Sequence, residues 1–120
     1  MAVGWLGTVT VSKNAGTWRL AKGVELVNLE DVIHDGVQFV AVGKTGKVGL
    51  SPDGEAWTFH ESGTAAWLKH VTIGGGTYAA VGTHGTIVTS TNGSKSTERN
   101  TPTTNGLASE AFGNGQFVAV

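Results

Sequence analysis

One tripeptide, Ala-Val-Gly, recurs at a constant interval along this 120-residue chain. It occupies residues 2–4, 41–43 and 80–82, and Ala119-Val120 begin a further copy, so that each occurrence follows the previous one by 39 residues. Other columns keep the same spacing without a gap: Gly7/Gly46/Gly85, Val9/Val48/Ile87, Leu29/Leu68/Leu107 and Phe39/Tyr78/Phe117. A fixed period of this length indicates one supersecondary unit repeated along the chain. We therefore expect a single repeat domain over residues 1–120, with units at 2–40, 41–79 and 80–118.

Each unit holds four candidate strands, which we letter A to D from the inside out. The expected strands of the two clearest units are 29–34, 38–42, 47–51 and 56–60, then 67–73, 77–81, 86–91 and a fourth after Asn92. Asp-Gly or Asn-Gly pairs join several of them, and glycine makes up 19 of the 120 residues, as tight hairpins require. No segment sustains a helical period, so the fold class is all-β. Four strands per unit of about 40 residues predict the blades of a β-propeller; a β-prism or β-trefoil is the alternative.

The C–D joins share a polar turn pattern. Ser51-Pro52-Asp53-Gly54-Glu55-Ala56-Trp57 resembles an Asp-box, the turn motif of sialidase-like propellers, and the surrounding repeat is similar to blades of phage and bacterial propellers and of photosystem II assembly factors. Looser versions contain Ser12, Asn14 and Trp18, and Ser90, Asn92 and Gly93, the last with Ser96 in place of the tryptophan. The resemblance implies a structural role for these residues, together with the propeller fold, and it leaves the function open because such blades host many activities.

Three blades cannot close into a ring, since propellers contain about four to eight. Residues 2–3 read as the end of a B strand followed by C and D, whereas residues 116–120 supply most of another B strand after an A strand. We therefore expect homodimerisation into a six-bladed ring in which the two chains share the blade at each junction. A homotrimer with nine blades is the alternative, and the chain also fits an engineered or excised piece of a longer propeller.

The B–C loops keep their glycines and vary the two residues between them, as a fixed scaffold with variable tips would. Trp5 and Trp67 lack aromatic counterparts in the other units, and the expected D–A loops at 21–28, 60–66 and 99–106 share their face. The candidate ligand-binding residues are Trp5, Lys44, Trp67, His84 and Arg99. An exposed tryptophan beside polar groups suits a sugar or a protein partner; alternatively, both tryptophans cover the chain junction or a neighbouring blade.

The A strands would line a central channel. The expected channel residues are Glu30, Asp31, Lys69, His70 and Ser109. Glu110 stands in the column of Val32 and Val71, which leaves a local register change and a charged core position as alternatives. Such a channel could order water or bind an ion, but solvated charges are the simpler expectation.

Composition excludes several functions. The net charge of −1 provides no basic field for nucleic acid, there is no cysteine, and the four histidines match no metal-ligand spacing. The chemistry of the sialidases that the chain resembles needs an arginine cluster, and only Arg19 and Arg99 are present. We expect no catalytic residues, no cofactor, no metal, no signal peptide and no membrane span, hence a soluble protein of unspecified compartment. The sequence favours a non-catalytic scaffold or interaction module, with a carbohydrate-binding propeller as the alternative.

Overall fold

The structure is a computed structural model that describes residues 1–21 and 27–120. The described chain is all-β, as predicted, and its strands form four antiparallel sheets. The expected loop at 21–28 falls mostly outside the described residues. The described segments contain no α-helix, and the only helical turns are three short 3-10 turns at η1 (Trp5–Gly7), η2 (Lys44–Gly46) and η3 (Thr83–Gly85).

Two sheets have four strands each. One contains β4 (Leu29–His34), β5 (Phe39–Gly43), β6 (Lys47–Ser51) and β7 (Thr58–Glu61), and the other contains β8 (Leu68–Gly74), β9 (Thr77–Gly82), β10 (Ile87–Ser90) and β11 (Thr97–Arg99). Within each sheet the strands pair in chain order, as successive hairpins do. The bounds of β4 and β6 are those predicted from the sequence, and the other predicted strands differ by one or two residues at their ends.

The other two sheets are smaller. The first contains β1 (Ala2–Val3), β2 (Val9–Val11) and β3 (Arg19–Leu20), and the last contains β12 (Glu110–Gly113) and β13 (Gln116–Ala119). In repeat terms, the first sheet has the end of a B strand with C and D, whereas the last has A and B. We call these the terminal sheets and the four-stranded pair the central sheets.

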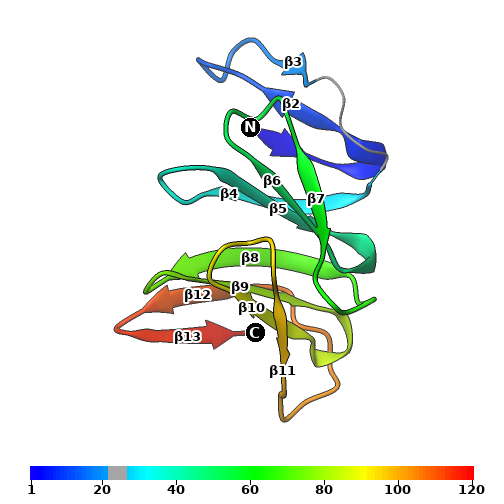
Figure 1. The fold of residues 1–120 in the computed structure, drawn as a ribbon, viewed down its shortest axis with the longest axis vertical. Helices are drawn as coiled ribbons and strands as arrows, with labels where there is room; N and C mark the ends of the chain where they lie inside the picture. The colour runs from blue at the N-terminus through cyan, green and yellow to red at the C-terminus, as the bar shows by residue number, and fades with distance from the viewer. Residues whose placement is uncertain (22–26) are drawn as a thin grey trace.

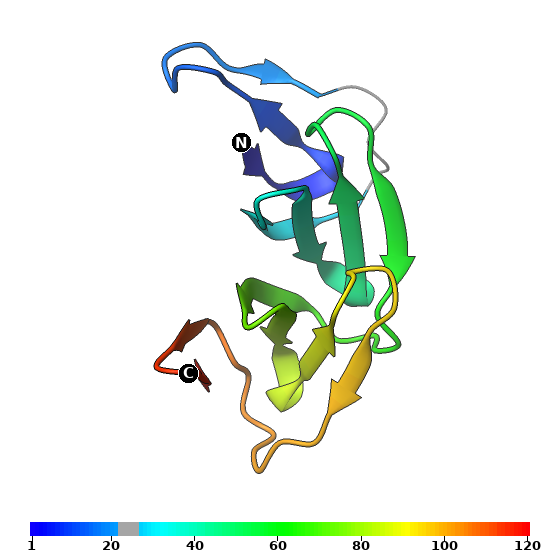
Figure 2. The same cartoon turned by 60° about the vertical axis from the view of Figure 1, so that its left-hand side comes forward.

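The four sheets are stacked along the 42 Å axis of the molecule, with the first at the top of Figure 1 and the β12–β13 hairpin beside β8 in the lower part, where β11 and the loop after it reach farthest down. Figure 2 shows them as an open arc, in which the outer strands β7 (green) and β11 (orange) lie on one side. Strand β8 lies between β4 and β12, and the view from below places the β12–β13 hairpin along the edge of the β8 sheet. The A strands of neighbouring sheets therefore lie side by side.

The core fills the spaces between adjacent sheets. The larger cluster, between the two central sheets, is made of Val40, Val42, Val48, Leu68, Val71, Tyr78, Ala80 and Val88. A smaller cluster of Val9, Leu29 and Ala41 lies between the first sheet and the β4 sheet. Alternate residues of each strand enter these clusters, as the period-2 pattern of a strand dictates.

Each A strand of the central sheets begins with a register shift, between Leu29 and Asp31 and between Leu68 and His70. Such a bulge places one extra residue against the partner strand and turns the following side chains to the opposite face. The simple alternation expected for the A strands is therefore broken at the positions that carry charge, Glu30 and Lys69. This break matters for the site described next.

Candidate functional site

The second and third loop tips are built on paired glycines that the packing requires. A Cβ on Gly43 or Gly82 would overlap the backbone carbonyl of Asn28 or Trp67, at the point where the A strand of the same sheet begins. Gly46 and Gly85 have φ of 67° and 69°, a region that glycine enters without strain. The glycine columns found in the sequence are therefore backbone contacts between neighbouring segments, and the residues between them are free to vary.

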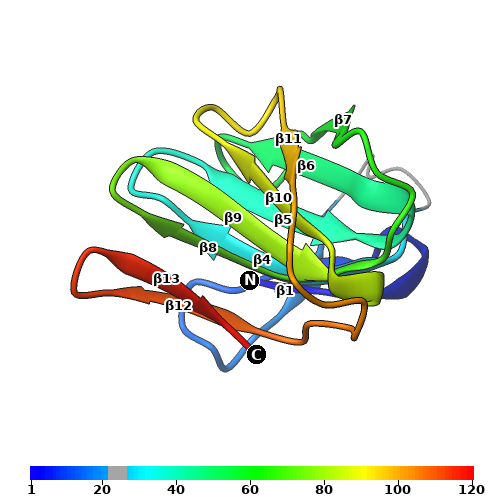
Figure 3. The ribbon, with the colours of Figure 1, turned by 90° about the horizontal axis from the view of Figure 1, so that it is seen from below.

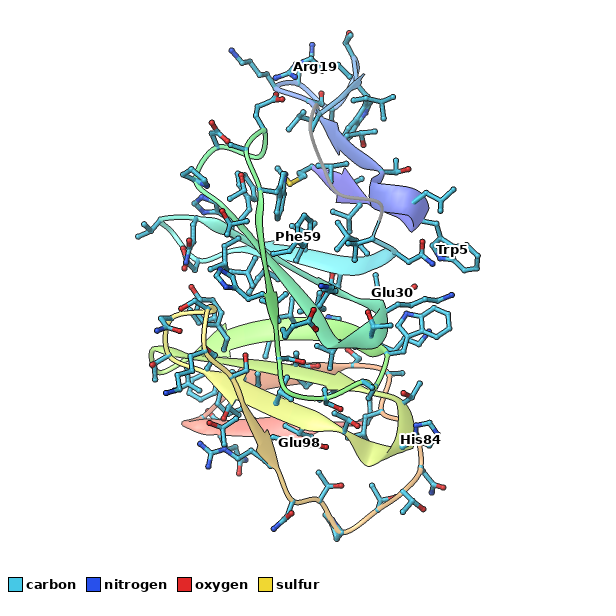
Figure 4. All side chains as sticks on the ribbon, turned by 45° about the vertical axis from the view of Figure 1, so that its right-hand side comes forward. Trp5, Arg19, Glu30, Phe59, His84 and Glu98 are labelled. Atoms are coloured by element: carbon cyan, nitrogen blue, oxygen red, sulfur yellow. The ribbon has the colours of Figure 1, made fainter. Side chains whose placement is uncertain are left out.

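Three of the predicted ligand-binding residues meet at the first two tips. Lys44 places its Nζ 4.5 Å from the ring centroid of Trp5 and 4.1 Å from that of Trp67. The two indole rings are tilted, with centroids 6.5 Å apart, so the ammonium group is shared between them. Trp5 is 60% exposed, and Figure 4 shows its ring at the edge of the molecule. We call Trp5, Lys44 and Trp67, together with Lys69 and Glu30, the tip cluster.

Lys69 and Glu30 join this cluster from the A strands. The Nζ of Lys69 lies 3.3 Å from the Trp67 ring centroid and 3.9 Å from Glu30 Oε2. The two residues are repeat equivalents on the neighbouring strands β4 and β8, and the sequence alone predicts both in the channel. A spacing of two residues places Trp67 and Lys69 on the same face of a regular strand, which could have predicted their contact. The bulge between Leu68 and His70 changes the facing of the residues after it, and the sequence does not reveal the bulge.

Hydrogen bonds fix the loops around the cluster. The backbone N–H of Trp67 donates to Thr83 Oγ1 at 3.0 Å, and that of Leu6 donates to Asn28 Oδ1 at 2.8 Å. Leu6 has φ of 54°, as do its equivalents Thr45 and His84 within a few degrees, so each tip holds one non-glycine residue in the left-handed region, followed by a left-handed glycine. The indole Nε1 of Trp67 is buried and has no acceptor among the described residues. The cluster is thus held by its backbone before any ligand arrives.

His84 and Arg99 do not join the tip cluster. His84 is exposed at the third tip, on the same edge of the molecule as Trp5 and Glu30 but farther along it in Figure 4. The Nε of Arg99 donates to Thr89 Oγ1 at 2.8 Å, and the side chain lines a separate hollow with Asn92 and Lys95. The structure therefore brings together Trp5, Lys44 and Trp67 from the predicted set, and leaves His84 and Arg99 apart from them.

A second polar cluster joins the A strands. His70 on β8 has its Nδ1 3.0 Å from Glu110 Oε2 on β12 and its Nε2 3.5 Å from Asp31 Oδ2 on β4. Asp31 also accepts the backbone N–H groups of Val32 and Val71. Three neighbouring strands are thus connected through one imidazole.

Glu110 is the buried member of this second cluster. It pairs with Ala119 as Val71 pairs with Ala80, so it keeps the repeat register and occupies a core position. This resolves the alternatives left by the sequence in favour of a charged core position. Burial raises the pKa of Glu110, opposed by the hydrogen bond with His70. The predicted channel residue Ser109, in contrast, bonds through its backbone to Val120. Among the described residues no group of three or more His, Asp and Glu is arranged to hold a metal ion.

The C–D turns show why their polar residues recur. Asp53 Oδ1 accepts the backbone N–H groups of Glu55 and Ala56 at 2.8 and 3.1 Å, and these bonds lower the pKa of its carboxyl group. Ser51 Oγ accepts from Gly54 N–H at 2.8 Å, and the Trp57 indole donates to the Gly54 carbonyl at 3.0 Å. All these partners lie within the turn, so its polar groups are satisfied locally.

The other two turns repeat this arrangement. Asn14 Oδ1 accepts from Gly16 and Thr17 as Asp53 does, with Ser12 beside it, and the Trp18 indole again donates within its turn. In the third turn Asn92 Oδ1 accepts from Ser94 and Lys95, and Ser90 Oγ accepts from Gly93 N–H. Asparagine supplies the same acceptor oxygen as aspartate here, without the charge.

A scan against protein-family models finds no match for this chain, and no curated protein matches it. In the described residues, no helix is long and apolar enough to cross a membrane. Two features of the described residues bear on function: the difference between terminal and central sheets, and the tip cluster.

Proposed function

We propose that this chain is a non-catalytic β-propeller interaction module, whose three blades close with those of a second copy into a six-bladed ring. The repeat unit of 39 residues supports the proposal, since each central sheet has four antiparallel strands with its A strand beside the A strand of the next sheet. The turns containing Ser12, Asp53 and Asn92 act as structural Asp-boxes in this reading.

One observation carries the proposal: equivalent apolar positions are buried in the middle of the chain and exposed at its end. Val40 and Val42 on β5 are each 1% exposed, whereas their equivalents Val118 and Val120 are 55% and 72% exposed. An exposed apolar face beside an unpaired strand edge favours association with another copy. A second copy presents a matching C strand, because its first sheet contains C and D strands with only two residues of a B strand and no A strand.

Closure would give the module a role as a scaffold. A ring of two copies would place two tip clusters on one face, related by a two-fold axis. Variable side chains on glycine-fixed loops are the usual means by which a rigid β scaffold contacts partners. The chemistry thus lies at Trp5, Lys44 and Trp67, and the blades hold them in position.

Solution mass tests the proposal directly. Size exclusion with light scattering across a range of concentrations should give a species of about twice the 12.3 kDa chain mass. A trimer would indicate nine blades and replace the six-bladed ring. A folded monomer at every concentration up to the millimolar range would overturn closure by self-association.

A second candidate function, carbohydrate binding, rests on the exposed indole of Trp5. An aromatic face beside the Lys44 and Lys69 ammonium groups and the Glu30 carboxylate offers both stacking and hydrogen bonds to sugar hydroxyls. A glycan array should then show binding that Trp5→Ala abolishes. Trp18→Ala is the matched control, because Trp18 is also exposed but lies in a C–D turn. An inert array would leave the scaffold function alone.

A further inference from the structure

Strand β2 already carries a partner on its inner edge. Ala2 pairs with Thr10 and Val3 pairs with Val9, in an antiparallel ladder of two residues. At the opposite end of the long axis, β13 pairs with β12 on one edge, and no strand of the described residues occupies its other edge. The inner edge of β2 and the outer edge of β13 therefore differ, because the chain's own residues 2–3 already occupy part of the edge of β2.

The central sheets show how a complete B strand pairs with its C strand. On β5 and β6 the pairs are Phe39↔Ser51, Val40↔Leu50, Ala41↔Gly49 and Val42↔Val48, and β9 pairs with β10 in the same register. A shift by the 39-residue period maps the last two pairs onto Ala2↔Thr10 and Val3↔Val9, which the structure contains. Residues 119 and 120 are also repeat equivalents of residues 41 and 42. In the same register, Ala119 of a second copy would pair with Thr10, and Val120 with Val9.

Residues 2–3 and 119–120 thus specify the same partners on β2, and only one segment can occupy them at a time. The segment at 117–120 would offer four pairs, with Phe117 opposite Ser12 and Val118 opposite Val11 in addition to the shared two. Since cross-strand pairs are the unit of sheet stability, the longer segment should win where both compete at high concentration. Assembly would also cover Val118 on β13 and the adjacent Val120, both of which are exposed in the separate chain.

We propose that Ala2–Val3 is a placeholder strand, which residues 117–120 of a second copy displace from β2 when the two chains assemble. This inference rests on the proposed self-assembly. It adds the register in which residues 117–120 pair with β2 and the free energy needed to release residues 2–3. Met1 and Val3 pack against the cluster of Val9, Leu29 and Ala41, so their release opposes assembly. The placeholder protects the edge of β2 in the separate chain and sets the concentration at which the ring forms.

A disulfide lock tests the displacement. The chain has no cysteine, so the variant Ala2→Cys with Thr10→Cys carries only the introduced pair. These residues are direct cross-strand partners, whose Cα separation of about 4.5–5.5 Å suits a disulfide. Oxidation fixes the placeholder on β2 and should raise the dissociation constant of the dimer at least about tenfold, the scale of losing several cross-strand pairs. Reduction of the same sample should restore the wild-type constant, and Ala2→Cys alone should respond to neither treatment.

A second variant traps the exchanged strand. Thr10→Cys with Ala119→Cys should form a disulfide between two chains, because β2 and β13 lie at opposite ends of one chain. Thr10→Cys with Val118→Cys is the matched control, since a shift of one residue turns the side chain to the other face and should prevent the bond. Mass spectrometry under mild oxidation reads both.

The outcomes separate the two proposals. A locked protein that dimerises with wild-type affinity, or equal disulfide yield at positions 118 and 119, would overturn the placeholder and leave self-assembly standing. Chains that stay monomeric whether wild type, locked or reduced, and yield no intermolecular disulfide, would overturn both.

Discussion

The central and terminal sheets are built from the same repeat, yet they differ in what covers them. Val40 on β5 lies between two sheets and is buried, whereas Val118, its equivalent on β13, is exposed. The tryptophans of the C–D turns differ in the same way, with Trp57 packed against the core beside Phe59 and Trp18 exposed. Burial in this fold is therefore a property of the neighbouring sheet, and a unit at the end of the array cannot complete its own core.

A charge placed at equivalent positions of a central and a terminal sheet tests this difference in burial most strongly. Val40→Asp should unfold the chain, since an unpaired buried carboxylate costs about 3–5 kcal/mol. Val118→Asp should leave the stability of the separate chain within about 0.5 kcal/mol of wild type, because that side chain is exposed. Urea denaturation at low protein concentration measures both. Equal loss in the two variants would mean that β13 is covered within one chain.

A milder version truncates leucines of one repeat column, Leu68 and Leu107. Leu68 is fully buried in the larger cluster, so Leu68→Ala should cost about 2–5 kcal/mol. Leu107 has the same place in the last unit but is only half-buried, and Leu107→Ala should cost less than half as much. Thermal unfolding followed by circular dichroism compares them. A larger effect at Leu107 would contradict the ranking of the sheets.

The glycine column offers a test of backbone packing. Gly43→Ala should destabilise the chain by about 1–3 kcal/mol, because the new methyl group overlaps the carbonyl of Asn28. Gly4→Ala should be tolerated within about 0.5 kcal/mol, since the nearest atom to its Cβ would be Thr8 Cβ at an ordinary 3.7 Å. Both residues have extended φ, so the difference isolates packing from conformational freedom. Chemical denaturation with identical slopes for both variants is the readout.

Glu110 on the terminal strand β12 should make the stability of the chain depend on pH. Because burial raises its pKa, the folded chain holds this proton more tightly than the unfolded chain does, and stability falls as pH rises above the ordinary glutamate pKa. Glu110→Gln should therefore stabilise the chain near pH 7 and have little effect below about pH 4. Midpoints of thermal unfolding across this pH range measure the effect. A variant less stable than wild type at neutral pH would show that the bond with His70 outweighs the cost of burial.

Asp53 should show the opposite sign and the smallest effect. Hydrogen bonds from Glu55 and Ala56 lower its pKa, so its contribution is present above the ordinary aspartate pKa of about 3.9 and is lost as pH falls through the lower folded value. Asp53→Asn keeps the acceptor oxygen, as Asn14 and Asn92 do in the other turns. It should flatten the acid limb of the stability profile without changing the neutral plateau. An unchanged acid limb would show that protonation of Asp53 does not contribute to the loss of stability at low pH.

Periodicity predicted most of the fold and half of the site. The strand bounds of β4 and β6 followed from alternation and turn residues, because a period of two is strict where one face is buried. The bulge after Leu68 lay beyond this reasoning, since nothing in the local residues announces an extra position in a ladder. It is the reason that Lys69 reaches the Trp67 ring and Glu30 reaches Lys69, although the alternation assigned both to the channel.

Side-chain direction was the other obstacle. Arg99 was predicted beside the tips from its place in a loop, but it ends β11 and its long side chain runs toward Thr89. The tip position of Lys44, in contrast, could be predicted because flanking glycines fix its backbone. Glu110 needed the structure, since only the observed pairing with Ala119 separates a register change from a charged core position.

The backbone bonds between sheets have a consequence for how the chain would come apart. Leu29 donates its N–H to the carbonyl of Gly4 in the preceding sheet, and Leu107 donates to that of Gly82. Each bond joins the segment that leads into one sheet to the loop that follows the B strand of the sheet before it. The rate of amide hydrogen exchange at residues 29 and 107 would therefore report how often the boundary between two units opens. Protection there that matches the strand centres would mark the chain as a single cooperative unit, and lower protection would mark the boundaries as the places where unfolding begins.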